Sequence, residues 1–129
     1  MSTPAPRPRQ HPRERFADTE KVYLLDDEFA AMAEESTVHQ GHMQKALYRH
    51  GGVTTAIFQF ESEGLIREHS VSGESIVHVL TGELAVTTET TTHTLPAGSL
   101  LLLKPDVKHD LRATKPTRML MTVALDHAG

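Results

Sequence analysis

The sequence contains no cysteine and no tryptophan, and aromatic residues make up only 5% of its 129 positions. The absence of cysteine excludes disulfides, thiol nucleophiles, iron–sulfur clusters and thiolate-bound zinc. Long apolar runs are also missing, because the longest aliphatic stretch, Leu100 to Leu103, is far shorter than the ~20 residues of a membrane-spanning helix. We therefore expect no membrane partner, and any metal site has to use imidazole and carboxylate ligands.

What remains is the composition of one ordinary folded domain. Hydrophobic residues account for 38% of the chain and charged residues for 23%, and a chain of this length can bury a core without disulfides. Histidine is abundant, with 9 residues. The sequence carries no leader or lipidation pattern, and together with the missing cysteine this predicts a cytoplasmic protein.

The charge is distributed unevenly along the first third of the chain. Residues 1–15 hold four arginines and four prolines but a single glutamate, a composition that predicts a disordered arm over residues 1–19 and one folded domain over residues 20–129. Arginines without neighbouring aromatic residues are a weak pattern for binding phosphate. We therefore expect no nucleic-acid partner.

An acidic segment follows the arm. Residues 18–35 carry seven acidic residues and one lysine. Within this segment the spacing of Leu25, Phe29 and Met32 places three apolar side chains on one face of a short helix, with Asp26 or Asp27 as its cap. The acidic side chains near its start favour the positive end of the helix dipole. We expect this helix to pack over a sheet.

The remainder of the chain has the pattern of an antiparallel β-protein. Short runs of threonine and aliphatic residues alternate with turn residues from position 45 to 125, and no helical period appears there. Alternation predicts inner faces that include Phe58 and Phe60 on one strand and Met119 and Met121 on the last. The run Leu100 to Leu103 is apolar on both faces, so we expect it to be central, or covered by the helix or by another subunit.

Two histidines belong to strands of this pattern, His109 at the start of one and His69 at the end of the segment 65–69. His109 alternates with Leu111, which predicts that its side chain enters the interior. For His69 alternation alone does not choose the inner face, but it does predict that Arg67 and His69 share one face.

Four segments together resemble the cupin family. The segments 64–69, 72–74 and 79–84 resemble the first cupin motif, and the segment 95–101 with Pro105 and His109 resembles the second. The resemblance covers about residues 45–125. It implies an all-β, jelly-roll antiparallel β-barrel, here with a short N-terminal helix, a pocket inside the barrel and frequent dimerisation. It also implies that His69 lies on the pocket side, and Arg67 with it by parity.

The resemblance further implies a metal site, which this sequence matches only in part. The family site takes two histidines separated by one residue, then a glutamate, then a later histidine, and here only His69 and His109 stand at those positions. Val71 and Ser75 occupy the other two. Such a site would hold one divalent transition metal as its cofactor.

Two nearby residues are candidates for additional metal ligands. Glu74 is one residue from the expected carboxylate, and His78 follows on the same strand, but both have the parity of the opposite face. A bulge near Gly73 could turn either residue inward. The metal hypothesis therefore depends on His69 and His109, with Glu74 or His78 completing the shell.

Three hypotheses about function follow. The first is a protein that binds a small molecule, with an anion held by Arg67, in a pocket formed by Arg67, His69, His109, Phe58, Phe60, Val71 and Met121. The second is a metal-dependent oxygenase, isomerase or lyase that uses His69 and His109. The third is a protein-interaction module that engages another protein through its dimer surface and its acidic segment. In each case we expect a homodimer.

Overall fold

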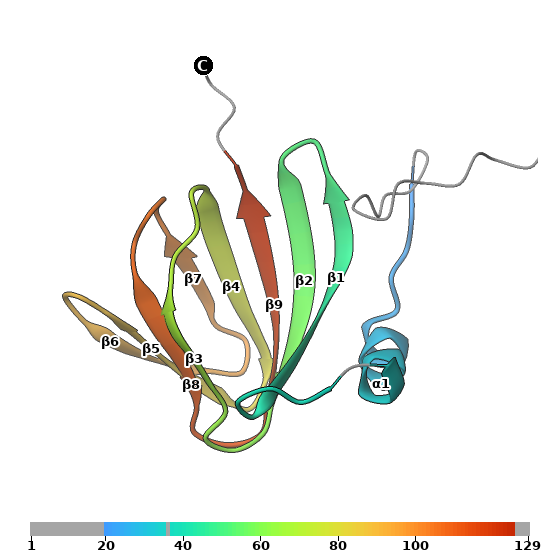
Figure 1. Ribbon diagram of the computed structural model, residues 1–129, viewed down its shortest axis with the longest axis horizontal. Coiled ribbons are helices and arrows are strands. Elements are labelled where there is room, and N and C mark those ends of the chain that lie inside the picture. Colours follow the sequence, from blue (N-terminus) through green and yellow to red (C-terminus); the bar gives the residue numbers. More distant parts are fainter. Residues whose placement is uncertain (1–19, 36, 126–129) are drawn as a thin grey trace, which may run out of the picture.

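A computed structural model describes residues 20–35 and 37–125 of the chain (Figure 1). The arm predicted over residues 1–19 lies outside the described residues. Within them the chain forms one helix and nine strands: α1 (Leu25–Glu35), β1 (His42–His50), β2 (Val53–Phe60), β3 (Leu65–His69), β4 (Glu74–Thr81), β5 (Glu83–Thr88), β6 (Thr92–Pro96), β7 (Leu100–Leu103), β8 (His109–Ala113) and β9 (Thr117–Ala124).

The strands form two antiparallel sheets that face each other (Figure 1). One sheet has the order β1-β2-β9-β4-β7, and the other has the order β3-β8-β5-β6. The predicted all-β, jelly-roll fold with a short N-terminal helix is confirmed. The closed barrel is not, because within residues 20–35 and 37–125 every paired strand stays inside its own sheet.

The main core lies between the two sheets. Phe58, Phe60, Met119 and Met121 are all buried there, as the alternation of apolar residues predicts. Leu111 of β8 faces them from the smaller sheet. Burying side chains of this size stabilises the fold by about 1.5–3 kcal/mol each.

A second, smaller core lies on the outer face of the larger sheet. Phe29 and Met32 of α1 pack there against Leu47 of β1 and Ile57 of β2. The helix begins at Leu25, so Asp26 and its neighbour occupy the first turn instead of capping it. Their charges still lie at the positive end of the helix dipole.

Ion pairs hold the helix against the sheet. The Lys45 ammonium lies 3.3 Å from the Glu28 carboxylate, and the Arg118 guanidinium lies 3.6 Å from Asp26. The same guanidinium stacks over the Phe29 ring, 4.6 Å from its centroid. Part of the acidic segment therefore serves the packing of α1.

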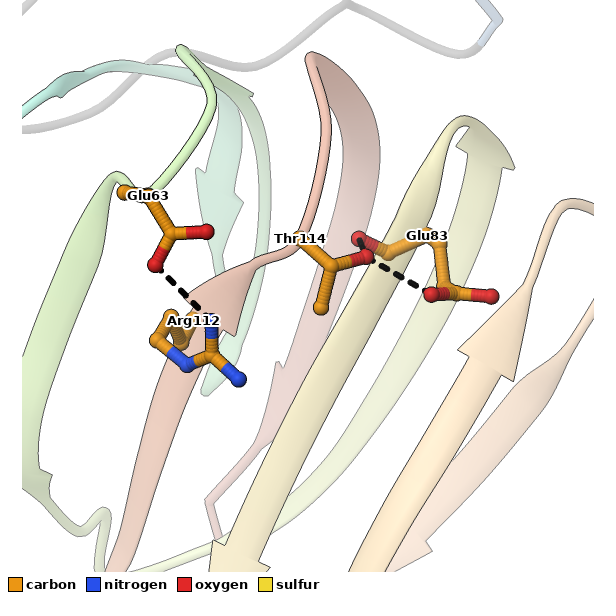
Figure 2. Close-up of polar contacts among 4 residues, drawn as sticks. All are labelled: Glu63, Glu83, Arg112 and Thr114. Atoms are coloured by element: carbon orange, nitrogen blue, oxygen red, sulfur yellow. Dashed lines mark hydrogen bonds and ion pairs between the residues drawn. The ribbon is translucent and has the colours of Figure 1, made fainter.

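Polar contacts join the turns at the lower end of the sandwich in Figure 1. Arg112 donates to Glu63 at 2.8 Å, and the Thr114 hydroxyl donates to the Glu83 carboxylate at 2.7 Å (Figure 2). Gly82, in the β4–β5 turn, has a φ of 85°. A Cβ atom there would lie 2.2 Å from the Pro116 carbonyl oxygen, so only glycine fits.

Strand β7 is an edge strand of the larger sheet, so the prediction that it is central is wrong. The helix does not cover it either, because α1 packs on β1 and β2 at the opposite edge (Figure 1). Leu103 points into the core, while Leu100 and Leu102 are 67% and 51% exposed. Of the three expectations for this strand, only coverage by another subunit stays a prediction.

Coverage by a second copy can be tested by placing charge on this face. If the parent is a dimer through β7, the double variant Leu100→Glu, Leu102→Glu should sediment as a monomer, because burying unpaired carboxylates is costly. Circular dichroism should show unchanged strand content, since both side chains lie outside the core. A parent protein that sediments as a monomer at micromolar concentration would contradict the dimer.

Candidate functional site

A cavity of about 800 Å³ is lined by residues of the β1–β2 hairpin and the β3–β4 loop. The hairpin and the loop lie at the upper end of the sandwich in Figure 1. The volume of the cavity lies in the range usual for small-molecule sites. The apolar wall comes mainly from the inner faces of β2 and β9, with Ala56, Phe58, Met121 and Val123. Its polar side chains include Gln44, Arg49, Thr54 and His69.

The predicted histidine pair meets beside this cavity. His69 lines the cavity, and it lies opposite His109 in the β3–β8 ladder. The two rings meet edge to face, with centroids 5.2 Å apart and an interplanar angle of 89°. His109 is only 2% exposed and does not belong to the cavity wall, so it lies behind His69.

The hydrogen bond of His109 determines which of its ring nitrogens carries a proton. Its Nδ1 donates to the Val107 carbonyl at 2.9 Å, and because a carbonyl only accepts, Nδ1 carries the proton. In a neutral ring Nε2 is then an acceptor. This atom is buried and has no partner among the residues that the structure describes. A buried acceptor in this position is available to a polar hydrogen of His69 or of a ligand.

A bulge in β3 separates Arg67 from His69. Ile66 pairs with Leu111 and His69 pairs with His109, so three steps along β3 match two steps along β8. The extra residue puts both Ile66, which packs against the core, and His69 on the inner side. Arg67 is exposed and lies outside the cavity wall. The prediction that Arg67 shares a face with His69 is wrong for this reason.

A second bulge, in β1, brings a different arginine to the cavity. Ala46 pairs with Ala56 and Tyr48 pairs with Thr55, so Leu47 is the extra residue. Regular alternation would put position 49 on the outer face with Leu47. The bulge instead puts Arg49 opposite Thr54, on the cavity side. Arg49 is not identifiable from the sequence, because no local pattern indicates this bulge.

The aromatic and aliphatic residues predicted for the pocket divide into two groups. Phe58, Val71 and Met121 line the cavity together with His69. Phe60 does not, because it is fully buried toward the other end of β2. Its ring stacks on Phe58 at a centroid distance of 6.4 Å. Phe60 therefore supports the wall from behind, and its assignment as a pocket residue is wrong.

Another buried histidine, which no sequence motif indicates, lies beside this aromatic pair. His42, at the start of β1, is 9% exposed, and its ring centroid is 5.7 Å from that of Phe60. In the pairing of β1 with β2, His42 lies directly opposite Phe60. Burial lowers the pKa of His42, and a hydrogen bond to Gln44 opposes this shift.

The two additional metal ligands considered above lie on the wrong face of the sheet. Ser75 and Val77 of β4 are fully buried toward the core, so Glu74 and His78 point outward. Glu74 pairs there with Lys104 at 3.8 Å. The irregularity of β4 falls between Val79 and Thr81, far from Gly73. The assignment of Glu74 or His78 as completing ligands is therefore wrong.

The residues present do not fit a divalent metal. Two imidazoles remain, with a serine and a valine at the other family positions, and the Ser75 hydroxyl is a weak ligand. Among the side chains that the structure describes, which leave out Glu68, no three of His, Asp or Glu converge as a metal site would require. A carboxylate and a third imidazole are the missing donors.

A family comparison agrees with the two-sheet fold and with the strands that surround this cavity. The cupin domain model matches residues 56–123, more than half of the chain. The chain is a cupin. No curated protein matches the sequence. In the described part of this cupin, no helix is long and apolar enough to cross a bilayer.

Solved structures similar to this cupin share its fold at low sequence identity. A conserved protein of unknown function from Streptococcus pyogenes is 18% identical, with a TM-score of 0.66 over 92% of this chain and 98% of that one. A cupin superfamily protein from Desulfitobacterium hafniense is 16% identical, with a TM-score of 0.67 over 90% and 100%. Salicylate 1,2-dioxygenase from Pseudoaminobacter salicylatoxidans is 16% identical, with a TM-score of 0.71 over 79% of this chain and 34% of that one. Such identities establish a shared fold and do not carry over an activity.

The buried histidines predict a loss of stability in acid. Burial, followed by the nearby charge of His109, lowers the pKa of His69 from 6.5, and burial lowers that of His42. The unfolded chain therefore takes up protons more readily just below pH 6.5, and the free energy of unfolding falls as the pH drops through that range. The variants His42→Phe and His69→Gln should each flatten this decline in urea unfolding. An equally steep decline in both variants would contradict the assignment.

The missing donors predict a gain of metal binding on substitution. The double variant Val71→His, Ser75→Glu should bind Mn²⁺ or Co²⁺ at least about tenfold more tightly than the parent in calorimetric titration, because it restores the family donor set. The control Val71→His, Ile76→Glu puts the glutamate on the outer face of β4 and should behave like the parent. Tight stoichiometric binding by the parent would show that His69 and His109 suffice.

Proposed function

We propose that this cupin binds a small molecule in the cavity between the β1–β2 hairpin and the β3–β4 loop. The observation that carries the proposal is an open cavity of about 800 Å³ whose inner wall is mostly apolar and whose polar groups include His69. Sites that bury small ligands combine an apolar wall with a few convergent polar groups in this way.

The wall suggests how such a ligand is held. Phe58, Met121 and Val123 offer contact to an apolar part of the molecule. His69 offers a hydrogen bond, and because burial lowers its pKa its ring is neutral near pH 7 and can donate or accept. The hydrogen bond from His109 Nδ1 to the Val107 carbonyl orients the His109 ring, which lies behind His69. Arg67 has no place in this binding mode, since it lies outside the wall.

The other two hypotheses have less support. A metal-dependent oxygenase, isomerase or lyase needs donors beyond His69 and His109, and the described residues do not supply them. An interaction module acting through the acidic segment competes with the ion pair that already engages Glu28 with Lys45 of the sheet. The cytoplasmic location, the homodimer and the lack of a nucleic-acid partner stay predictions.

Filling the cavity tests the proposal. Nile red, a neutral dye that fluoresces in apolar sites, should bind the parent protein. The variant Ala56→Leu adds carbon atoms to the inner wall and should weaken this binding at least about fivefold, because overpacking a site costs ~1–3 kcal/mol. The variant Ala97→Leu makes the same change in an exposed turn and should bind like the parent.

A further variant identifies where the dye sits. The exposed side chain of Leu102 on β7 offers a second apolar contact, so Leu102→Gln should leave the fluorescence unchanged if the cavity is the site. A signal lost in Leu102→Gln but kept in Ala56→Leu would contradict the proposal.

A further inference from the structure

We propose that the ligand is a carboxylate with an elongated apolar body, and that the Arg49 guanidinium binds its carboxylate at the mouth of the cavity. This inference rests on the proposed function, since it assigns the chemical class of the molecule that the cavity binds. It depends on three features: the fixed position of Arg49, the charge of the cavity wall, and the distance from Arg49 to the apolar end.

The backbone fixes Arg49 at the mouth from both sides. On one side the bulge at Leu47 turns Arg49 toward Thr54 and the cavity. On the other side the β1–β2 hairpin closes with Gly51 and Gly52, whose φ angles of 60° and 84° are those of a tight two-residue turn. A guanidinium on such a rigid support offers two parallel N–H donors to a carboxylate.

The charge around Arg49 is uncompensated in the described part of the chain. Among the carboxylates whose side chains the structure describes, which leave out Glu68, none forms an ion pair with it, whereas Arg112 pairs with Glu63 and Arg118 pairs with Asp26. The whole chain has 17 acidic residues against 13 lysines and arginines, yet none of the described residues that line the cavity is acidic. A cavity with one arginine and no acid, in a protein of net negative charge, favours an anionic ligand.

The shape of the cavity sets the form of that ligand. Arg49 lies opposite Thr54, and Phe58 lies four residues further along β2, which is about 13 Å at the usual rise of a strand. The wall between these points is formed by Ala56 and, on the neighbouring strand, by Met121 and Val123. A carboxylate bound at Arg49 therefore leaves room for an apolar chain or ring that reaches Phe58.

The experiment compares two probes that differ only in charge. 8-Phenyloctanoate and its primary amide, 8-phenyloctanamide, are titrated into the full chain by calorimetry. The parent should bind the carboxylate about fivefold more tightly than the amide, as expected for one ion pair that remains open to solvent. This preference should shrink as sodium chloride is added, because salt screens exposed charges.

Two matched variants assign the preference to one side chain. Arg49→Gln should abolish the preference, so that this variant binds the carboxylate and the amide with equal affinity. Arg67→Gln removes the same charge from an exposed site outside the cavity and should keep the preference. Arg49→Lys should retain part of it, since a lysine keeps the charge without the paired donors.

The outcomes separate this inference from the proposed function. Equal binding of both probes by the parent, or an equal loss of preference in Arg49→Gln and Arg67→Gln, would overturn the role of Arg49 while leaving the cavity as a binding site. Failure of both probes and of Nile red to bind the parent would overturn both proposals together.

Discussion

The alternation of side chains along a β-strand is the constraint on which the rest of this structure depends. Both faces of the larger sheet are used: Phe58 and Phe60 of β2 point into the space between the sheets, while Ile57 of the same strand points to α1. One extra residue in a strand exchanges the two faces for every residue beyond it. The positions at which β1 and β3 depart from regular alternation therefore determine which side chains line the cavity.

The two bulges exchange one arginine for another at the cavity. In β3 the extra residue keeps His69 on the inner side and leaves Arg67 exposed, and in β1 it brings Arg49 to the inner side. Bulges are frequent beside binding sites, because they redirect a single side chain while the sheet continues on either side. In this cupin they place an imidazole and a guanidinium on opposite sheets around one apolar space.

The same alternation of side chains distinguishes this cavity from the metal centre of the family pattern. Strand β4 runs regularly past Ser75, which fixes Glu74 and His78 on the outer face and leaves a serine where the family carries a carboxylate. What remains of the histidine set is a packed pair in which His109 is held by a backbone carbonyl. Such a pair can orient a hydrogen bond to a ligand without holding a cation.

The sequence by itself determined the two-sheet β fold, the apolar inner faces of β2 and β9, the helix over the sheet and the burial of His109, because these follow from local alternation, spacing and turn residues. The cupin motifs also placed His69 beside His109. Only the tertiary structure decided which arginine meets the cavity, that Phe60 supports the wall instead of forming it, and that β7 lies at an edge. These features arise from pairing between strands distant in sequence, where an extra residue is tolerated or excluded by the partner strand and by the cores on both faces.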